Sequence, residues 1–195
     1  SLIGYHSKGT KRKSDREGVA IASRYPFVYY SANHLVTRTN LLLLGFRRVS
    51  VMGEFVVPGF GRVRVVNVHL AHMPFEHRVR GKQLIETLQW VQDRENQVPA
   101  DITFLGGDFN MKPHWQEMSM ITDPSFYGEL GFEDFNSHEP TKDIRSARGK
   151  RIDYIFVAAP DRAVALLEEK ILWKHGIARS NEPSRLWVSD HLLVF

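Results

Sequence analysis

A chain of 195 residues with 43% hydrophobic and 25% charged residues has the size and composition of a folded protein, which excludes a disordered one. Its 26 Lys and Arg against 22 Asp and Glu give a net charge of +4, a mild excess that favours a phosphate-bearing partner without requiring one. The absence of cysteine excludes disulfides, thiolate nucleophiles and cysteine zinc sites, and no apolar run reaches the roughly 20 residues that span a bilayer. We expect one domain over residues 1–195, whose compartment and oligomeric state the composition does not indicate.

Short runs rich in Val and Ile, each bounded by Gly, Pro, Asn or Asp, predict six strands. In chain order these are Val19–Ser23, Val49–Val57, Val63–Leu70, Ile102–Leu105, Ile152–Val157 and Leu192–Phe195. Between the third and fourth strands, apolar residues recur at helical spacing from Glu76 to Gln92, which predicts an amphipathic helix. A second, short helix is expected at Trp115–Ile121, and Ala163–Glu169 is a third helix or a strand. This alternation predicts an α/β domain of packed sheets with outer helices.

Polar side chains collect where two of the predicted strands end. Alternation along "VRVVNVHL" places Asn67 and His69 on one face, at the end of the strand. Asp108 and Asn110 are likewise two residues apart after the strand "ITFL", and extended backbone would project both to the same side. The two glycines that precede Asp108 permit close approach of other backbone. We therefore expect two polar pairs at strand ends.

Two further segments bring acids and an imidazole to strand ends. In "RIDYIFV", Asp153 faces opposite to Ile152 and Tyr154, and a lone carboxylate in such a strand is costly unless it is paired. The segment "SDH" supplies Asp190 and His191 directly before the last predicted strand. Four strand ends therefore carry residues of the types that bind a hard cation or move a proton.

Each of these residues also has a purely structural interpretation. The Asn-x-His pair could cap a strand and hydrogen-bond a loop, and the Asp-x-Asn pair could form an Asx turn. Asp153 could be the buried partner of Arg151 or Lys150, and Asp190 could cap a turn. The occurrence of all of them at strand ends is harder to attribute to turns alone.

In chain order, "EGVAIASRYP", "VVNVHL", "GGDFN", "RIDYIFV" and "SDH" resemble the successive motifs of the endonuclease/exonuclease/phosphatase superfamily, from Glu17 to the C-terminus. The combination is specific, although each motif alone is weak. Arg80 and Gln83 also resemble the Arg-x-x-Gln pair that opens the helix after the Asn-x-His strand in many members. The resemblance implies the deoxyribonuclease I-like fold, a four-layer α-β-β-α sandwich of two mixed sheets with outer helices. It also implies Mg²⁺-assisted hydrolysis of a phosphate ester at the upper edge of the sheets.

Such hydrolysis needs an activated water in line with the leaving oxygen, and neutralisation of charge on the phosphoryl oxygens. By resemblance, Asp153 accepts a hydrogen bond from His191 and fixes its tautomer. Asp108 orients or deprotonates the attacking water, and Asn110 holds a phosphate oxygen or ligates the metal. His69 donates to the phosphoryl or leaving oxygen. Asp108 and His191 are both candidates for the general base.

The resemblance also bears on the metal, Mg²⁺ or Mn²⁺ in its place, for which Asp190 is the expected ligand. The family's principal metal ligand is a Glu in a Gln-Glu motif after the first strand, and "LIGYHSKG" resembles the stretch that follows this motif. We therefore expect a domain that lacks its first strand and metal-binding Glu. Glu17 resembles the Glu that pairs with the catalytic His in pancreatic-type deoxyribonucleases, so it would orient His69. The alternative for Glu17 is a solvated charge before a strand.

Two competing sites are disfavoured. "GYHSKGTK" nearly fits a phosphate-binding P-loop, but Thr10 stands where the Lys should be and no strand precedes it. His69, His72 and His77 match no zinc signature in their spacing.

Substrate class is argued from charge and from one histidine. Basic residues gather in two clusters, Lys8, Lys11, Arg12, Lys13 and Arg16, and Lys142, Arg145, Arg148, Lys150 and Arg151. Charge runs usually mark solvated loops, but the second cluster directly precedes Asp153, where contact with a phosphate backbone is the alternative. His69 stands where abasic-site endonucleases have Tyr, which disfavours abasic repair.

We rank the functions in three classes. The first is a metal-dependent phosphodiesterase, nucleases included. The second is a phosphohydrolase of lipid or sugar phosphates, sphingomyelinase-like or a phosphatase. The third, from outside enzymes, is a non-catalytic nucleic-acid-binding module that keeps the fold.

Overall fold

The fold is seen in a computed structural model that describes residues 6–10, 18–36, 48–73, 76–123, 125, 130–135 and 150–159, and four two-residue strands near the C-terminus. The elements in chain order are β1 His6–Thr10, β2 Val19–Ser23, β3 Tyr29–His34, β4 Val49–Val57, β5 Gly61–His69, α1 His77–Gln97, β6 Ile102–Asp108, α2 Gln116–Thr122, β7 Glu133–Asp134, β8 Asp153–Ala158, β9 Ile171–Leu172, β10 Ile177–Ala178, β11 Arg185–Leu186 and β12 Leu193–Val194.

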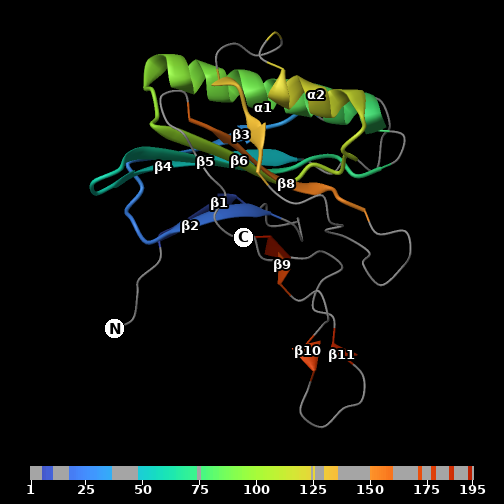
Figure 1. The fold of residues 1–195 in the computed structure, drawn as a ribbon, viewed down its shortest axis with the longest axis horizontal. Helices are drawn as coiled ribbons and strands as arrows, with labels where there is room; N and C mark the ends of the chain where they lie inside the picture. Colours follow the sequence, from blue (N-terminus) through green and yellow to red (C-terminus); the bar gives the residue numbers. More distant parts are fainter. Residues whose placement is uncertain are drawn as a thin grey trace.

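A six-stranded mixed sheet forms the centre, in the order β3-β4-β5-β6-β8-β7. β5 and β6 pair in parallel, and the other neighbours pair antiparallel. Parallel neighbours need a long crossover, and α1 provides it between them. Figure 1 shows α1 and α2 together over one face of this sheet, with the β1–β2 pair on the opposite side.

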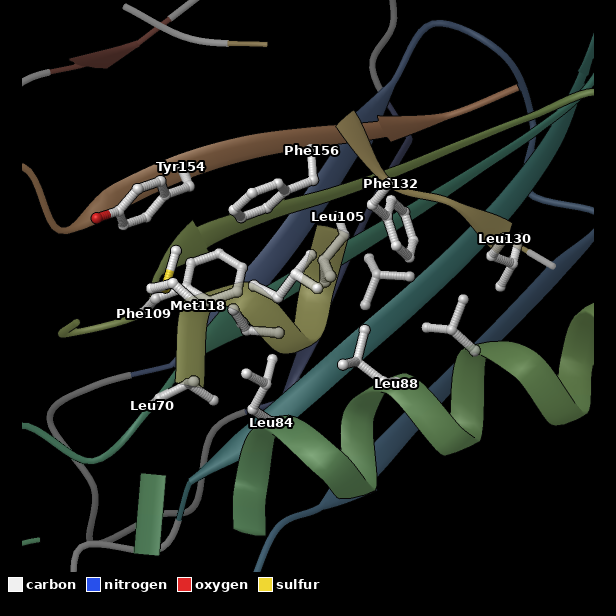
Figure 2. Packing of buried hydrophobic residues seen from close by; sticks show 14 of the residues in the cluster. Leu70, Leu84, Leu88, Leu105, Phe109, Met118, Leu130, Phe132, Tyr154 and Phe156 are labelled. Atoms are coloured by element: carbon white, nitrogen blue, oxygen red, sulfur yellow. The ribbon is translucent and has the colours of Figure 1, made fainter. Parts of the chain in front are cut away.

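The main core lies between the helices and the sheet. Leu84 and Leu88 of α1 lie in one buried cluster with Leu105 of β6. Phe109, the residue after β6, and Phe156 of β8 belong to the same cluster, and Figure 2 shows these side chains converging. The rings of Phe109 and Phe156 meet edge to face, with their centroids 5.4 Å apart. Burying each such side chain contributes roughly 1.5–3 kcal/mol, so this layer fixes the sheet on which the polar strand ends lie.

The opposite face of the sheet is covered by β2. Val19 and Ile21 of β2 form a buried cluster with Val51 of β4. Asn67 of β5 joins the two layers, because its Nδ2 donates to the carbonyl oxygen of Ala20 at 2.9 Å. Helices on one face of a mixed sheet and a second, antiparallel sheet on the other agree with the predicted α/β fold. An outer helix beyond the second sheet is not seen in the described ranges.

The predicted elements agree closely with the structure where their sequences are strongly patterned. The strands predicted at Val19–Ser23 and Val49–Val57 match β2 and β4 residue for residue. The long helix begins one residue later and ends five residues later than predicted, because α1 continues to Gln97 through charged residues that bind the sheet. β3 was missed, since "YYSANH" mixes aromatic and polar residues in an outer strand. The prediction for Ala163–Glu169 lies outside the described residues.

A buried charge cluster, which the sequence did not indicate, ties α1 to the sheet. The carboxylate of Glu54 on β4 is fully buried and accepts hydrogen bonds from Arg62, Arg64 and Arg94 at 2.8–2.9 Å. Arg64 also pairs with Glu95. Since Arg94 and Glu95 belong to the last turns of α1, these pairs explain why the helix extends beyond its apolar pattern.

No described helix is long and apolar enough to cross a membrane.

Candidate active site

Three adjacent strands of the central sheet bring His69, Asp108 and Asp153 into line. His69 ends β5 and lies opposite Asp108 in the parallel ladder with β6. Asp108 ends β6 and lies opposite Asp153, the first residue of β8, in the antiparallel ladder. Neighbouring strands are about 4.8 Å apart, so three residues separated by up to 84 positions in the chain share one edge of the sheet. We call these three residues the strand-end triad.

The triad faces away from the helices. Along β5, Val66 and Val68 are buried against the helical side, while the intervening Asn67 and His69 face the other layer, as the period of two predicted. His69 and Asp108 keep 28% and 14% of their side chains exposed, so both are reachable from solvent. The Nε2 atom of His69 lies 3.6 Å from Oδ2 of Asp108, an ion-pair distance if the imidazole is protonated.

The strand leading to Asp108 is longer than predicted. We placed its end at Leu105, but β6 continues through both glycines to Asp108 itself, because each of these residues pairs with β5 and with β8. The glycines make this possible. Gly107 has φ of 126°, and a Cβ there would lie 2.1 Å from the carbonyl oxygen of Val68. A Cβ on Gly106 would lie 3.2 Å from the carbonyl oxygen of Tyr154.

Asn110 departs from the prediction. It has φ of 52°, a left-handed conformation, so it does not continue the extended backbone on which the prediction was based. Its backbone N–H donates to Oδ1 of Asp108 at 2.8 Å, which is the Asx turn of the structural interpretation. Its side-chain Nδ2 donates to the carbonyl oxygen of Leu70 at 3.1 Å. The turn fixes the Asp108 carboxylate, with Oδ1 held by backbone and Oδ2 toward His69.

The start of β8 is held by Tyr154. Its buried hydroxyl lies 2.9 Å from the carbonyl oxygen of Met111 and 3.1 Å from that of Arg151, and so joins the segment after Asp108 to the segment before Asp153. Burial raises the pKa of Tyr154 above its ordinary value, which keeps the hydroxyl a donor. The structural interpretation of the sequence offered Arg151 as a partner of Asp153. In the structure, Nη2 of Arg151 donates a hydrogen bond to Oδ1 of Asp134 at 2.5 Å.

The Arg-x-x-Gln pair holds the segment that follows His69. Gln83 accepts a hydrogen bond from the backbone N–H of Ala71 at 2.9 Å and donates to the carbonyl oxygen of Val36 at 2.8 Å. Arg80 donates from Nη1 to the carbonyl oxygens of Ala71 and Met73 at 3.2 and 2.8 Å. Both side chains are almost fully buried. They therefore hold the backbone that follows His69 in place.

Three predicted site residues, Glu17, Asp190 and His191, lie outside the described residues. Among the residues that the structure does describe, no group of three or more His, Asp or Glu is placed to hold a metal ion. The carboxylates of the triad are donors of the kind that Mg²⁺ takes, but they do not complete a binding site alone.

The triad can do acid–base chemistry on a bound ester. A carboxylate held by a backbone N–H keeps its free oxygen oriented toward a water molecule, and an imidazole beside it can donate a proton to a negatively charged oxygen.

Sequence reasoning missed two supporting contacts. These are the hydrogen bonds of the Tyr154 hydroxyl, and a hydrogen bond of 2.7 Å between Nη2 of Arg48 and Nδ1 of His72.

Comparison with solved structures shows the same fold in proteins of low sequence identity. A truncated TDP2 of Caenorhabditis elegans superposes with a TM-score of 0.70 at 17% identity, over 97% of this chain and 73% of that one. A mannosyl-6-phosphatase of Bacteroides thetaiotaomicron gives 0.68 at 21% identity, over 99% and 76%. The human nocturnin catalytic domain with bound sulfate gives 0.64 at 17% identity, over 80% and 61%, so the chain spans less than two thirds of that domain.

A search among curated protein sequences finds no match. A family model does match, and it spans nearly the whole sequence, from residue 2 to residue 191. All the motifs quoted from "EGVAIASRYP" to "SDH" fall within that span. The chain belongs to the endonuclease/exonuclease/phosphatase family, whose members are phosphoester hydrolases.

Proposed function

We propose that this chain hydrolyses phosphate esters at the strand-end triad, with phosphodiesters, nucleic acids among them, as the first substrate class. The observation that carries the proposal is the alignment of His69, Asp108 and Asp153 on three neighbouring strands. Two acids and an imidazole at one solvent-reachable edge supply both proton transfer and charge stabilisation. Family membership supports the same reaction class.

Each residue of the site has a proposed role. Asp108, held through Oδ1 by the turn at Asn110, orients the attacking water with Oδ2 or takes its proton. His69 donates to a phosphoryl or leaving-group oxygen. Asp153 orients His191 as a second candidate base, and Glu17 orients His69. The roles of Glu17 and His191 rest on the sequence resemblance alone.

Mg²⁺, or Mn²⁺ in its place, is part of the proposal. A divalent ion would neutralise charge on the phosphoryl oxygens. Asp190 is the proposed ligand from the sequence resemblance. Because the described residues do not complete a metal site, the roles above are assigned to protein groups only.

A phosphatase acting on sugar or lipid phosphate monoesters is the second candidate. The similarity to a mannosyl-6-phosphatase over 99% of this chain favours it, although 21% identity transfers the fold and not the substrate. A non-catalytic nucleic-acid-binding module is the third. It would bind with strong salt dependence and would turn nothing over.

Hydrolysis of bis(4-nitrophenyl) phosphate by the full-length protein in Mg²⁺ tests the proposal. The Asp108→Asn variant should lose activity by about 10²-fold or more, the usual contribution of a positioned acid or base. Asp93→Asn, which changes an exposed acid on α1, is the matched control and should turn over as wild type. EDTA should abolish the reaction. Wild-type activity in Asp108→Asn would exclude the proposed site.

A substrate panel separates the three candidates. Single-stranded DNA, RNA, sphingomyelin and a sugar phosphate monoester would be incubated under identical conditions, each with an EDTA control. Faster turnover of the monoester than of any diester would replace the first candidate with the second. Binding of nucleic acid without turnover of any substrate would establish the third.

A further inference from the structure

A second imidazole lies just beyond the strand-end triad. His72 follows His69 by three residues and is exposed to solvent. Arg48, directly before β4, is only 5% exposed, and its Nη2 atom lies 2.7 Å from Nδ1 of His72. Since β4 begins at the edge of the sheet where β5 ends, this pair belongs to the same edge as the triad. We call it the Arg48–His72 arm.

The contact fixes the tautomer of His72. An arginine side chain is a donor only and stays protonated, so Nδ1 must accept the hydrogen bond. The ring proton of the neutral imidazole is therefore on Nε2. In this state His72 can donate a hydrogen bond from Nε2 and cannot take a proton there, which makes it unsuited to act as a general base.

The backbone at both ends of the arm is held by hydrogen bonds, although His72 is exposed. The backbone on either side of His72 is held by buried side chains of α1, with Gln83 on the N–H of Ala71 and Arg80 on the carbonyl oxygens of Ala71 and Met73. On the other side, the carbonyl oxygen of Arg48 accepts a hydrogen bond from the N–H of Leu35 at 3.1 Å. Little conformational entropy would thus be lost on binding a ligand.

We propose that the Arg48–His72 arm binds an oxygen of the substrate's phosphate group, with Nε2–H of His72 as the donor and Arg48 as the positioning residue. The charge of the guanidinium behind the ring favours an anionic acceptor over a neutral one. The oxygen it holds is not one whose bond breaks, so the arm contributes to substrate affinity and not to the chemical step. The inference rests on the proposed function of the triad.

Steady-state kinetics with bis(4-nitrophenyl) phosphate test the arm. His72→Ala should raise KM by about tenfold, the effect of one hydrogen bond to a charged group, while kcat stays within about twofold. His72→Gln keeps an amide N–H near the position of Nε2 and should recover most of the lost affinity. Arg48→Ala should also raise KM, and the double variant should be no worse than either single one, because the two residues act as a unit.

His77→Ala is the matched control. It removes another exposed imidazole, at the first residue of α1, and should leave KM unchanged. An equal rise of KM in His77→Ala and His72→Ala would overturn the arm, since a non-specific effect of removing a surface imidazole would then explain both. An unchanged KM in His72→Ala, with wild-type turnover, would overturn it as well.

A second readout does not depend on turnover. Imidazole ¹⁵N NMR should show the Nε2–H tautomer for His72 in the wild type, and inorganic phosphate should shift its Nε2 signal but not that of His77. Such a shift in a protein that hydrolyses no ester would refute the proposed function and retain the arm as an anion site. Turnover of the reporter, with no shift of His72 on adding phosphate, would refute the arm and retain the function.

Discussion

The buried carboxylate of Glu54 offers the sharpest test of how the fold is held. It is fully buried and accepts four hydrogen bonds from three guanidinium groups, of which that of Arg64 is itself fully buried. Glu54→Ala would remove one of the two carboxylates that pair with this buried positive charge. Removing one partner from a buried ion pair costs about 3–5 kcal/mol, so we expect a loss of that size in the free energy of unfolding. Glu54→Gln keeps an acceptor and should cost less, about 1–3 kcal/mol.

The pH dependence of the loss separates charge from shape. Burial alone would raise the pKa of Glu54, but the hydrogen bonds from Arg94 and Arg64 outweigh it and lower that pKa below its usual value. A depressed carboxyl pKa contributes stability that is complete above the unfolded value of about 4.3 and is lost as the pH falls through the folded value. The difference between wild type and Glu54→Gln should therefore be constant from pH 5 to 8 and shrink in more acidic solution.

Urea denaturation followed by circular dichroism would measure these free energies at each pH. Glu133→Gln, an exposed acid on β7, is the matched control and should change stability by less than about 0.5 kcal/mol at every pH. A midpoint for Glu54→Ala equal to that of wild type would refute the reasoning. So would a loss in Glu54→Gln that stays constant below pH 4.

Three further substitutions test the packing around the site. Leu88→Ala, in the core beneath the sheet, should cost roughly 2–5 kcal/mol in urea denaturation while the reporter is still hydrolysed; an unaltered midpoint would remove α1 from the core. Tyr154→Phe should cost about 1–3 kcal/mol in the free energy of unfolding and lower kcat. The reason is that the segments carrying Asp108 and Asp153 lose the hydroxyl that lies between the carbonyl oxygens of Met111 and Arg151. An unchanged kcat would show that other contacts hold the two acids. Gly107→Ala should reduce the melting temperature strongly, because its φ of 126° and the backbone oxygen 2.1 Å from a Cβ exclude a side chain; a melting temperature equal to that of wild type would contradict this geometry.

The parts of the fold that follow from local pattern were predictable. Alternation in β5 placed Asn67 and His69 on one face, and the apolar spacing between Glu76 and Gln92 predicted most of α1. The polar residues at four predicted strand ends also indicated that one edge of the sheet carries the functional site. The pairing of His69 with Asp108, and of Asp108 with Asp153, depends on which strands become neighbours, and the family resemblance implied only a common site at the edge of the sheets.

Other features depend on contacts between distant residues, which a single sequence does not carry. The glycines of "GGDFN" suggested the end of a strand, but pairing on both sides extends β6 to Asp108. Asn110 was expected to point with Asp108, but the Asx turn gives it a left-handed backbone. The sequence does not indicate that Glu54 is buried, and only the fold shows the arginines around it.

A crystal structure of the full-length protein with Mg²⁺ and orthovanadate, a mimic of the phosphoryl group in the transition state, would test most directly whether the strand-end triad is the active site. We expect the vanadate at the edge where β5, β6 and β8 meet, with an oxygen within hydrogen-bond distance of Nε2 of His69 and another facing Asp108. Vanadate bound elsewhere, with His69, Asp108 and Asp153 all contacting only protein, would contradict the account.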